Sequence, residues 1–275
     1  MQISLRHIDI HPALRGYVEK LWVFESSGRV PDADLKLVVP NGMIKLVIPY
    51  RNGLVGHREG LSGHSKEHQM TLIGISDVPF VVEAEKDSPS GTIGVEFSSL
   101  GAYRFFRLKQ SELKNQIYSA NEVLGKMTKE IEEQISQIEN VDAKVKILQL
   151  FLIRLFNKSE SDRLFEFCVR KIRETNGGVS IAELERATGY SGRWLNLKFD
   201  EKIGVSPKNL GAITRFLFVY ETLANNPKEI LKNKAYYNIY YDQAHFIKEF
   251  KRFTGLPPSK FENKANDFGK IFYKK

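Results

Sequence analysis

The pattern of hydrophobic and polar residues changes character near residue 119. Before that point, hydrophobic residues form short runs rich in β-branched side chains, separated by breaks that contain Pro, Gly, Asp and Ser. Three of these runs are Met70–Ile75, Phe80–Ala84 and Gly91–Phe97. Many short strands without helices between them predict a β-sandwich or a small barrel.

One segment of this region, Leu35–Ile48, holds two β-rich runs on either side of Asn41 and Gly42. An Asn-Gly dipeptide suits a tight hairpin turn and predicts that the two runs pair with each other. The neighbouring Pro40 favours the opposite outcome, because proline interrupts strand pairing. Both alternatives stay open at this point.

From Ser119 onwards, hydrophobic residues recur at spacings of 3 and 4, which is typical of amphipathic helices. Ser119 and Glu122 match a capping box, and the helix that they open is predicted to continue to Ile138. A second helix, Val141–Phe156, is hydrophobic almost all round at its centre. Such a helix has to be covered, either by the rest of the chain or by a second copy of the chain.

The remainder of the chain is predicted to be helical, with boundaries set by capping residues and helix breakers. The boundaries are Gly177-Gly178, the capping box of Ser180 and Glu183, Gly189, Ser191, Gly204, Ser206 with Pro207, Asn225-Asn226-Pro227, Asp242 and Gly255. Between them lie six helices, of which the fifth follows Pro227. The first carries Cys168 on its hydrophobic face, which predicts a buried structural thiol and not a nucleophile.

Two segments of this helical region match when they are overlaid. The first is Gly189–Phe199 followed by Gly204-Val-Ser-Pro207, and the second is Ile239–Phe250 followed by Gly255-Leu-Pro-Pro258. In each, a short helix and a tight turn precede a longer helix that ends in Phe, five residues before Gly. This is the layout of a helix-turn-helix, and it occurs twice.

The tandem units, their connecting helix and the segment Tyr241–Pro258 resemble the DNA-binding domain of AraC/XylS-type transcription regulators, over about residues 160–262. His11–Trp22 and Ile93–Phe97 are similar to the β-rich, cupin-like sensor domain of some members. The resemblance implies a two-domain α+β fold. Residues 1–118 would form a ligand-sensing β-barrel, residues 119–157 a helical linker or dimerisation segment, and residues 158–275 the tandem helix-turn-helix domain.

The resemblance also implies a function. The chain would be a sequence-specific DNA-binding transcription regulator and not an enzyme, responding to a small molecule or partner bound by its N-terminal domain. Its partners would be double-stranded DNA, a small-molecule effector, a second copy of the chain and RNA polymerase. No cofactor and no membrane are expected.

Residues for DNA contact follow from placing the second helix of each unit in the major groove, with its packed face turned away from the bases. The predicted base contacts are Arg193, Asn196, Gln243, Ala244, Ile247 and Lys248. The predicted phosphate contacts are Lys208, Arg215, Lys251 and Arg252. The first unit departs from the family pattern, with Leu197 and Asp200 where Arg and a basic residue are expected. Glu185 stands in place of a small residue, and Ile239 in place of a turn glycine.

The charge of the chain supports a polyanionic partner. Of the 275 residues, positions 1–157 hold 19 Lys and Arg against 19 Asp and Glu, whereas positions 158–275 hold 22 against 14. The whole net charge of +8 therefore lies in the predicted DNA-binding half. A single cysteine, no hydrophobic run near the about 20 residues of a membrane span and no signal-peptide pattern predict a cytoplasmic protein.

Two other functions are alternatives to that of a regulator. A metal-dependent cupin enzyme would need metal ligands, and His57, His64 and His68 lie close in sequence. They lack a His-X-His step and fall in a Gly/Ser/Lys-rich segment, which favours a surface loop and no metal site. Glu83, Glu85 and Glu96 face either solvent or the barrel interior. The third function is that of an architectural DNA-binding protein without a ligand.

Overall fold

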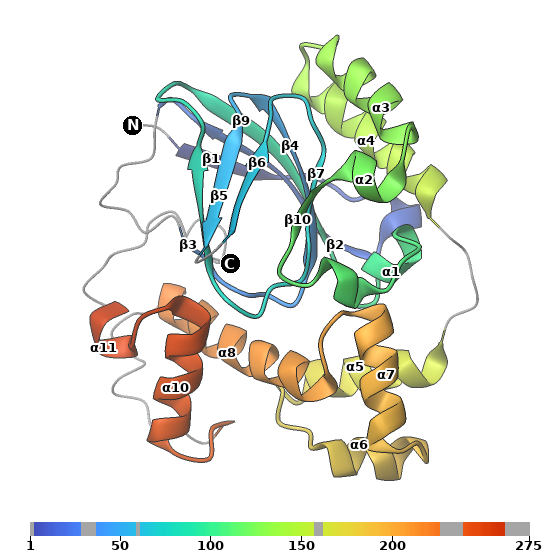
Figure 1. The fold of residues 1–275 in the computed structure, drawn as a ribbon, viewed down its shortest axis with the longest axis vertical. Helices are drawn as coiled ribbons and strands as arrows, with labels where there is room; N and C mark the ends of the chain where they lie inside the picture. The colour runs from blue at the N-terminus through green and yellow to red at the C-terminus, as the bar shows by residue number, and fades with distance from the viewer. Residues whose placement is uncertain (1–2, 29–36, 59–60, 157–161, 226–238, 262–275) are drawn as a thin grey trace.

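The computed structural model describes residues 3–28, 37–58, 61–156, 162–225 and 239–261 (Figure 1). The strands are β1 (Ile3–His7), β2 (Val18–Ser26), β3 (Leu37–Val38), β4 (Ile44–Arg51), β5 (Leu54–Arg58), β6 (Leu61–Ser65), β7 (Thr71–Ile73), β8 (Phe80–Ala84), β9 (Ser90–Phe97) and β10 (Ile117–Ser119). The α-helices are α1 (Ala102–Phe105), α2 (Ala120–Leu124), α3 (Met127–Ser136), α4 (Val141–Leu155), α5 (Arg163–Glu174), α6 (Ile181–Thr188), α7 (Gly192–Lys202), α8 (Pro207–Asn225), α10 (Gln243–Thr254) and α11 (Pro258–Phe261). Short 3-10 helices, η1 and η2, cover Pro12–Leu14 and Gln110–Leu113. The predicted α+β architecture, with a β-rich N-terminal part followed by helices, is confirmed.

Two antiparallel sheets face each other in the N-terminal part. The larger has the strand order β1-β2-β9-β4-β7-β10, and the smaller has the order β3-β8-β5-β6. Alternate side chains of the larger sheet point to opposite faces. Leu46 and Val95 belong to the core that is shared with the helices, whereas Val47 belongs to a separate cluster with Trp22. Every residue of β9 is buried because both of its faces are covered.

Of the two alternatives at Asn41-Gly42, the structure does not show the hairpin. Strand β3 pairs with β8 in the smaller sheet, whereas β4 pairs with β9 and β7 in the larger one. The segment between them crosses from one sheet to the other, and Gly42 takes a positive φ of 70° within it. The interruption favoured by Pro40 is the alternative that the structure shows.

The helix predicted from Ser119 to Ile138 is divided. Its capping box is present, because the Ser119 side chain accepts from the backbone of α2 and Glu122 accepts from the Ser119 N–H. Gly125 then takes a φ of 70° and ends α2, so α3 begins separately. The hydrophobic spacing continues across the break, and for that reason the sequence pattern alone did not reveal it.

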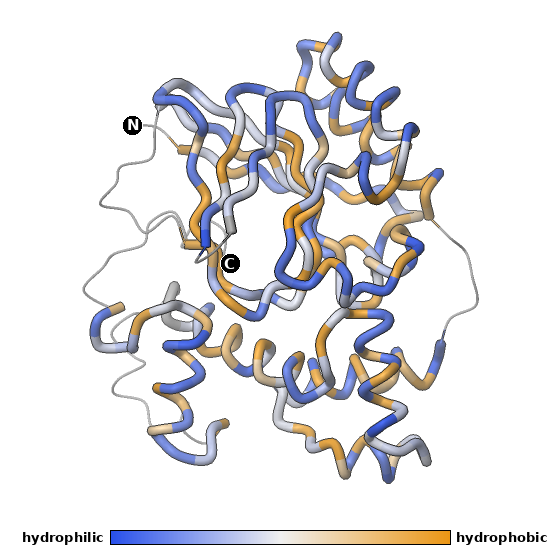
Figure 2. Tube along the Cα trace, viewed as in Figure 1, coloured by the Kyte–Doolittle hydropathy of each residue, from blue (hydrophilic) through white to orange (hydrophobic). Residues whose placement is uncertain are grey.

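Helix α4 is covered from within the chain on its main hydrophobic face. Val145, Leu148, Phe151 and Leu152 are buried in the same core as the larger sheet, and Leu150 is exposed. The same core continues into α5 and α7. Hydrophobic stretches therefore lie along the inner sides of the helices, where these meet the sheet and each other (Figure 2).

The helix caps of the C-terminal part agree with the predicted helix boundaries. Ser180 and Glu183 form a capping box, and α6 ends at Gly189 in the left-handed conformation. The side chains of Ser191 and Asp242 accept hydrogen bonds from the first turns of α7 and α10, and α10 ends at Gly255, again left-handed. The predicted fifth helix and the basic tail after residue 261 lie outside the described residues.

Cys168 is fully buried in α5, as predicted. Burial, with a smaller effect from Asp162, raises the pKa of its thiol to about 11. Within the described residues, no helix has both the length and the hydrophobicity to cross a membrane.

Candidate DNA-binding surface and ligand cavity

Helices α6 and α7 form the first helix-turn-helix unit. Leu184 of α6 and Leu195 and Phe199 of α7 are buried between the helices. The Glu185 side chain accepts a hydrogen bond from the Gly192 N–H at the start of α7. This departure from the family pattern therefore has a structural role, because it fixes one helix of the unit to the beginning of the other.

The outer face of α7 carries the predicted base-contacting residues. Arg193, Asn196 and the strongly exposed Leu197 border a shallow groove together with Asp200 and Ser206. The Asn196 side-chain amide donates to the Gly192 carbonyl of the same helix at 2.8 Å. The exposed side chains on this face are therefore two polar ones, Arg193 and Asn196, and one hydrophobic one, Leu197.

Asp200 is negatively charged where the family pattern has a basic residue. It forms a hydrogen bond with the N-terminal part of the chain. Its Oδ2 accepts from the Ser111 hydroxyl at 3.0 Å, and Ser111 lies in η2. The end of α7 is thus fastened to η2. Trp194 is half-buried, and its ring stacks on Tyr190 with centroids 4.0 Å apart and planes inclined by 13°.

Helix α10 belongs to the second unit and shows two clearly different faces. Phe246, Phe250 and Phe253 are buried in a cluster with α8. The residues on the other face are Gln243, Ala244, Ile247, Lys248 and Lys251, and all of them are exposed. The division of this helix into a packed and a free face is therefore confirmed, and α10 lies at one end of α8 while α6 and α7 lie at the other (Figure 1).

Arg215, predicted to contact a DNA phosphate, is not on the exposed surface. It is largely buried in α8, where its guanidinium donates to the Gly177 carbonyl at 2.7 Å and to Glu249 Oε1 at 3.0 Å. The guanidinium also lies over the Tyr240 ring at 5.5 Å. The charge of Arg215 is compensated inside the helical part, where it joins α8 to the turn after α5 and to α10, and this corrects its assignment as a phosphate contact.

The other predicted phosphate contacts differ among themselves. Lys208, near the start of α8, and Lys251, near the end of α10, are exposed. Arg252 is about half-exposed, but its guanidinium donates to Asp77 Oδ2 and to Asn209 Oδ1, both at 3.0 Å. Arg252 is therefore bound to the N-terminal part of the chain.

Asp77 is the centre of a polar cluster that the sequence did not indicate. It lies in the loop between β7 and β8, is almost fully buried, and accepts hydrogen bonds from Asn115, Asn209 and Arg252, with Lys114 at 2.9 Å. Burial would raise the pKa of Asp77, but the bonds from Asn115, Lys114 and Asn209 outweigh it and lower the pKa to about 2. Its carboxylate is thus charged at neutral pH and joins two parts of the chain that lie far apart in sequence.

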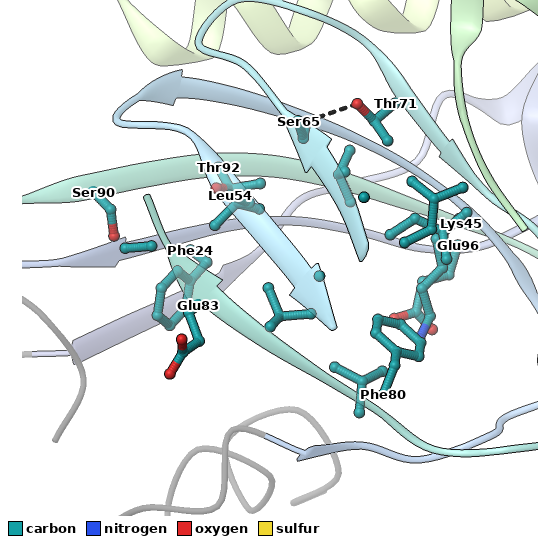
Figure 3. Close-up of a pocket in the computed structure, with 18 of the residues that line it drawn as sticks. Phe24, Lys45, Leu54, Ser65, Thr71, Phe80, Glu83, Ser90, Thr92 and Glu96 are labelled. Carbon is teal, nitrogen blue, oxygen red and sulfur yellow. Dashed lines mark hydrogen bonds between the residues drawn. The ribbon is translucent and has the colours of Figure 1, made fainter. Parts of the chain in front are cut away.

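A cavity of about 110 Å³ lies between the two sheets (Figure 3). Most of its wall is hydrophobic and includes Trp22, Phe24 and Phe80. Glu96 is buried and lines the cavity, so the interior alternative holds for it. Glu83 borders the cavity, but it pairs with Val55, which also pairs with His64, so its side chain lies on the outer face of the smaller sheet. Glu85 follows β8 and is exposed.

Lys45 and Glu96 bring opposite charges into this cavity. They are cross-strand neighbours on β4 and β9, and both are buried. Burial lowers the pKa of the Lys45 ammonium, and the negative charge of Glu96 partly opposes this shift. The sequence indicated this charged pair only through a lysine within the hydrophobic run Ile44–Ile48. It did not predict on which face of the sheet the Lys45 side chain lies.

The three histidines do not form a metal site. His57 lies on β5 and His64 on β6, so the predicted loop is wrong for these two, and both side chains are exposed. Among the described residues, no group of three or more His, Cys, Asp or Glu side chains could hold a metal ion.

Comparison with known proteins gives a partial match. Residues 6–119 match a family described as a domain of unknown function, DUF6597. No curated protein matches the chain significantly.

Among solved structures, the chain is similar to ToxT from Vibrio cholerae, with 14% identity, 90% of this chain and 99% of that chain covered, and a TM-score of 0.49. ToxT bound to (E)-4-(8-methylnaphthalen-1-yl)but-3-enoic acid also has 14% identity and the same coverage, with a TM-score of 0.45. The cupin domain of an XRE family transcriptional regulator from Enterobacter cloacae has 12% identity over 35% of this chain and 96% of that chain, with a TM-score of 0.28. At such identities and TM-scores, function has to be inferred from the residues of the chain itself.

Proposed function

We propose that this protein is a sequence-specific DNA-binding transcription regulator whose N-terminal part binds a small molecule. The observation that carries the proposal is helix α10, which packs one face with three phenylalanines and leaves Gln243, Lys248 and Lys251 free on the other. An exposed helix face with amide and ammonium groups suits base edges and phosphates in the major groove. The excess positive charge of residues 158–275 supports the same partner.

The small-molecule part of the proposal is supported by the cavity between the sheets. It is mostly hydrophobic and has a few convergent polar side chains, as ligand sites commonly do. We assign residues 1–118 to sensing, residues 119–157 to the linker and residues 158–275 to DNA binding. A second copy of the chain and RNA polymerase are further partners included in this proposal.

DNA binding is tested with the full chain and duplexes selected from random DNA. Affinity should fall steeply with salt, because each neutralised phosphate contributes a slope of about −0.9 in log affinity against log salt. Lys248→Ala should weaken binding by roughly 1–3 kcal/mol and relax sequence choice if Lys248 reads a base edge. Fluorescence anisotropy across a salt series measures both.

The matched control for this variant is Lys129→Ala, which removes an exposed lysine from α3. It should leave affinity and sequence choice unchanged. Salt-independent binding, or no binding to any duplex, would refute the proposal. An unchanged footprint for Lys248→Ala would remove Lys248 from the contact surface.

The alternative, a metal-dependent cupin enzyme, is tested by metal analysis of the purified protein. Stoichiometric zinc, iron or manganese that is lost in His64→Ala would favour it. The positions of His57 and His64 on exposed strand faces argue against such a site.

A further inference from the structure

The chemistry of the cavity wall restricts the ligand, on the basis of the proposed sensor function. Lys45 and Glu96 line the same side together with Phe80, whose ring lies 5.9 Å from Lys45 Nζ (Figure 3). The two charged groups are cross-strand neighbours, yet no direct ion pair joins these two described residues. Glu96 Oε2 accepts a hydrogen bond from Asn41 Nδ2 at 3.0 Å, which leaves the second carboxylate oxygen of Glu96 as an acceptor beside the Lys45 donor at the edge of a hydrophobic space.

The charges of Lys45 and Glu96 compensate each other. An anionic ligand would put a second negative charge beside Glu96, and a cationic ligand a second positive charge beside Lys45. Like charges at such distances are strongly unfavourable in a buried site. A neutral group that both accepts and donates would satisfy both side chains without this cost.

A second polar group faces the same space. The Thr92 hydroxyl lines the cavity, is buried, and has no hydrogen-bond partner among the described residues. The polar groups are few and the wall is otherwise hydrophobic, which disfavours sugars and phosphates, since their many polar atoms would be left without partners. A cavity of about 150 Å³ is known to hold benzene, so about 110 Å³ suits a small ring or a short branched chain.

We propose that the cavity binds a compact, hydrophobic, uncharged molecule through one group that accepts from Lys45 and donates to Glu96, such as a primary amide. Benzamide, benzoate and benzamidinium test this, because they have the same shape and differ in charge. Benzamide should bind the full chain at least tenfold more tightly than either ion, which corresponds to about 1.4 kcal/mol. Ligand-observed NMR titration measures all three affinities.

Variants of the charged pair should reverse the preference. Glu96→Gln leaves Lys45 uncompensated and should favour benzoate, whereas Lys45→Met should favour benzamidinium. Glu83→Gln, which removes a negative charge from the outer face of β8 beside the cavity, should keep the preference for benzamide. Tightest binding of benzoate or benzamidinium to the unmodified chain, or no binding of any of the three, overturns the proposal whether or not the variants fold. DNA binding is unaffected by these outcomes, so the two proposals fail separately.

A different set of contacts bears on regulation, and this second inference also rests on the proposed DNA binding. The β7–β8 loop connects two strands that line the cavity, through Ile73 and Phe80. Asp77 of this loop holds Arg252 near the end of α10 and Asn209 in the first turn of α8. The loop thus links the cavity wall directly to the second helix-turn-helix unit.

The first unit is held by a nearby contact. A Cβ on Gly204, in the turn after α7, would lie 2.6 Å from the Gln110 carbonyl oxygen of η2 and 3.0 Å from Ile75. With the bond from Ser111 to Asp200, this close approach fastens the end of α7 to the same side of the N-terminal part. Both groove-facing helices are therefore tied to the N-terminal part near their C-terminal ends.

Asp77 also affects the charge that α10 presents to DNA. It compensates the Arg252 guanidinium and places a buried carboxylate beside it. A phosphate approaching Arg252 would have to displace or oppose that carboxylate. The contact thus withdraws one positive charge from the DNA-binding surface.

We infer that the contact between Asp77 and Arg252 is autoinhibitory, restraining α10 and holding Arg252 away from the phosphates until the β7–β8 loop shifts. Asp77→Asn keeps the shape of the side chain and removes its charge. In the full chain it should bind a mixed-sequence duplex more tightly, and the salt slope should steepen by about 0.9, one phosphate contact. Arg252→Ala should have little effect alone and should abolish the gain in the Asp77→Asn background.

The matched control is Glu133→Gln, which removes one exposed negative charge from α3. It should leave the salt slope unchanged. Asn209→Ala removes another hydrogen bond to Arg252 and should shift the affinity for DNA in the same direction as Asp77→Asn. It therefore tests the same contact if the Asp77 variant does not fold. Binding by the unmodified chain with no gain in either variant, or a gain that persists without Arg252, overturns the inference. Absence of any salt-dependent binding would instead refute the proposed function.

Discussion

Lys45, Asp77 and Cys168 are ionisable side chains that the fold withdraws from water, and the direction in which each pKa shifts depends on the neighbours of the group. Asp77 stays charged because its neighbours stabilise the carboxylate, and its pKa falls to about 2. The Lys45 ammonium is disfavoured by burial, so its pKa is lowered. Burial, with a smaller effect from Asp162, raises the pKa of the Cys168 thiol to about 11. Burial alone thus does not decide the charge of a group, and the neighbouring donors do.

The Cys168 pKa leads to a prediction about reactivity. A rise from 9.0 to about 11 lowers the thiolate fraction near pH 8 by roughly 100-fold, and only the thiolate is nucleophilic. Cys168 in the folded chain should therefore react with iodoacetamide at least that much more slowly than a free exposed thiol. Mass spectrometry of timed samples measures the rate.

The matched control for this prediction is Ser136→Cys in a Cys168→Ala background, which places a thiol on the exposed end of α3. Its thiol should react at the rate of a free cysteine. Equal rates for the two proteins in their folded state would show that Cys168 is reached by reagent and keeps an ordinary thiolate. In denaturant the difference should disappear.

At the level of elements, the glycines that end helices differ in what surrounds them. Gly189 ends α6 with a φ of 75°, and an added Cβ would have nothing within 4 Å. Gly177 follows α5 with a φ of 76°, but its added Cβ would lie 2.0 Å from the Gly211 carbonyl of α8. At Gly189, only the left-handed backbone conformation disfavours a residue with a Cβ. At Gly177, close packing against α8 disfavours it as well.

Replacing each of these glycines by alanine should separate the two effects. Gly189→Ala should destabilise the chain by about 1–2 kcal/mol, the cost of a left-handed residue with a Cβ. Gly177→Ala should cost a further 1–3 kcal/mol or so, because α8 has to move as well. Urea unfolding of both variants gives the two free energies. Equal losses would mean that α8 yields without cost at Gly177.

Elements also explain two of the departures from the family pattern. Glu185 bonds to the start of α7, and Asp200 bonds to η2. A carboxylate that is poorly suited to phosphate contact is well suited to receive a backbone N–H or a hydroxyl. These two acidic residues therefore do not weaken the assignment of α6 and α7 as a helix-turn-helix.

At the scale of the whole molecule, the N-terminal and C-terminal parts share one hydrophobic core and several polar contacts. Leu46 and Val95 of the larger sheet and Phe199 of α7 belong to one cluster. Asp77 and Ser111 add polar bonds to the C-terminal part. A change in the N-terminal part therefore has direct physical routes to both α7 and α10, without a long chain of intermediates.

The sequence alone determined the change from strands to helices near residue 119, the caps of α2, α6, α7 and α10, and the two faces of α10. These features depend on residues close together in the chain, such as Ser180 with Glu183, or Phe246 with Phe250 four residues later. The uneven distribution of charge along the chain also followed from the sequence alone, because it requires only a count of the charged residues.

The tertiary structure decided every feature that joins distant residues. It placed β3 and β4 in different sheets, turned Lys45 and Glu96 into the cavity, and enclosed Arg215 in an internal ion pair. It also brought Asp77 and Arg252 together across 175 positions. Local propensity and periodicity carry no information about which face of a strand is enclosed or which distant charge lies opposite, since these follow from how the sheets and helices pack.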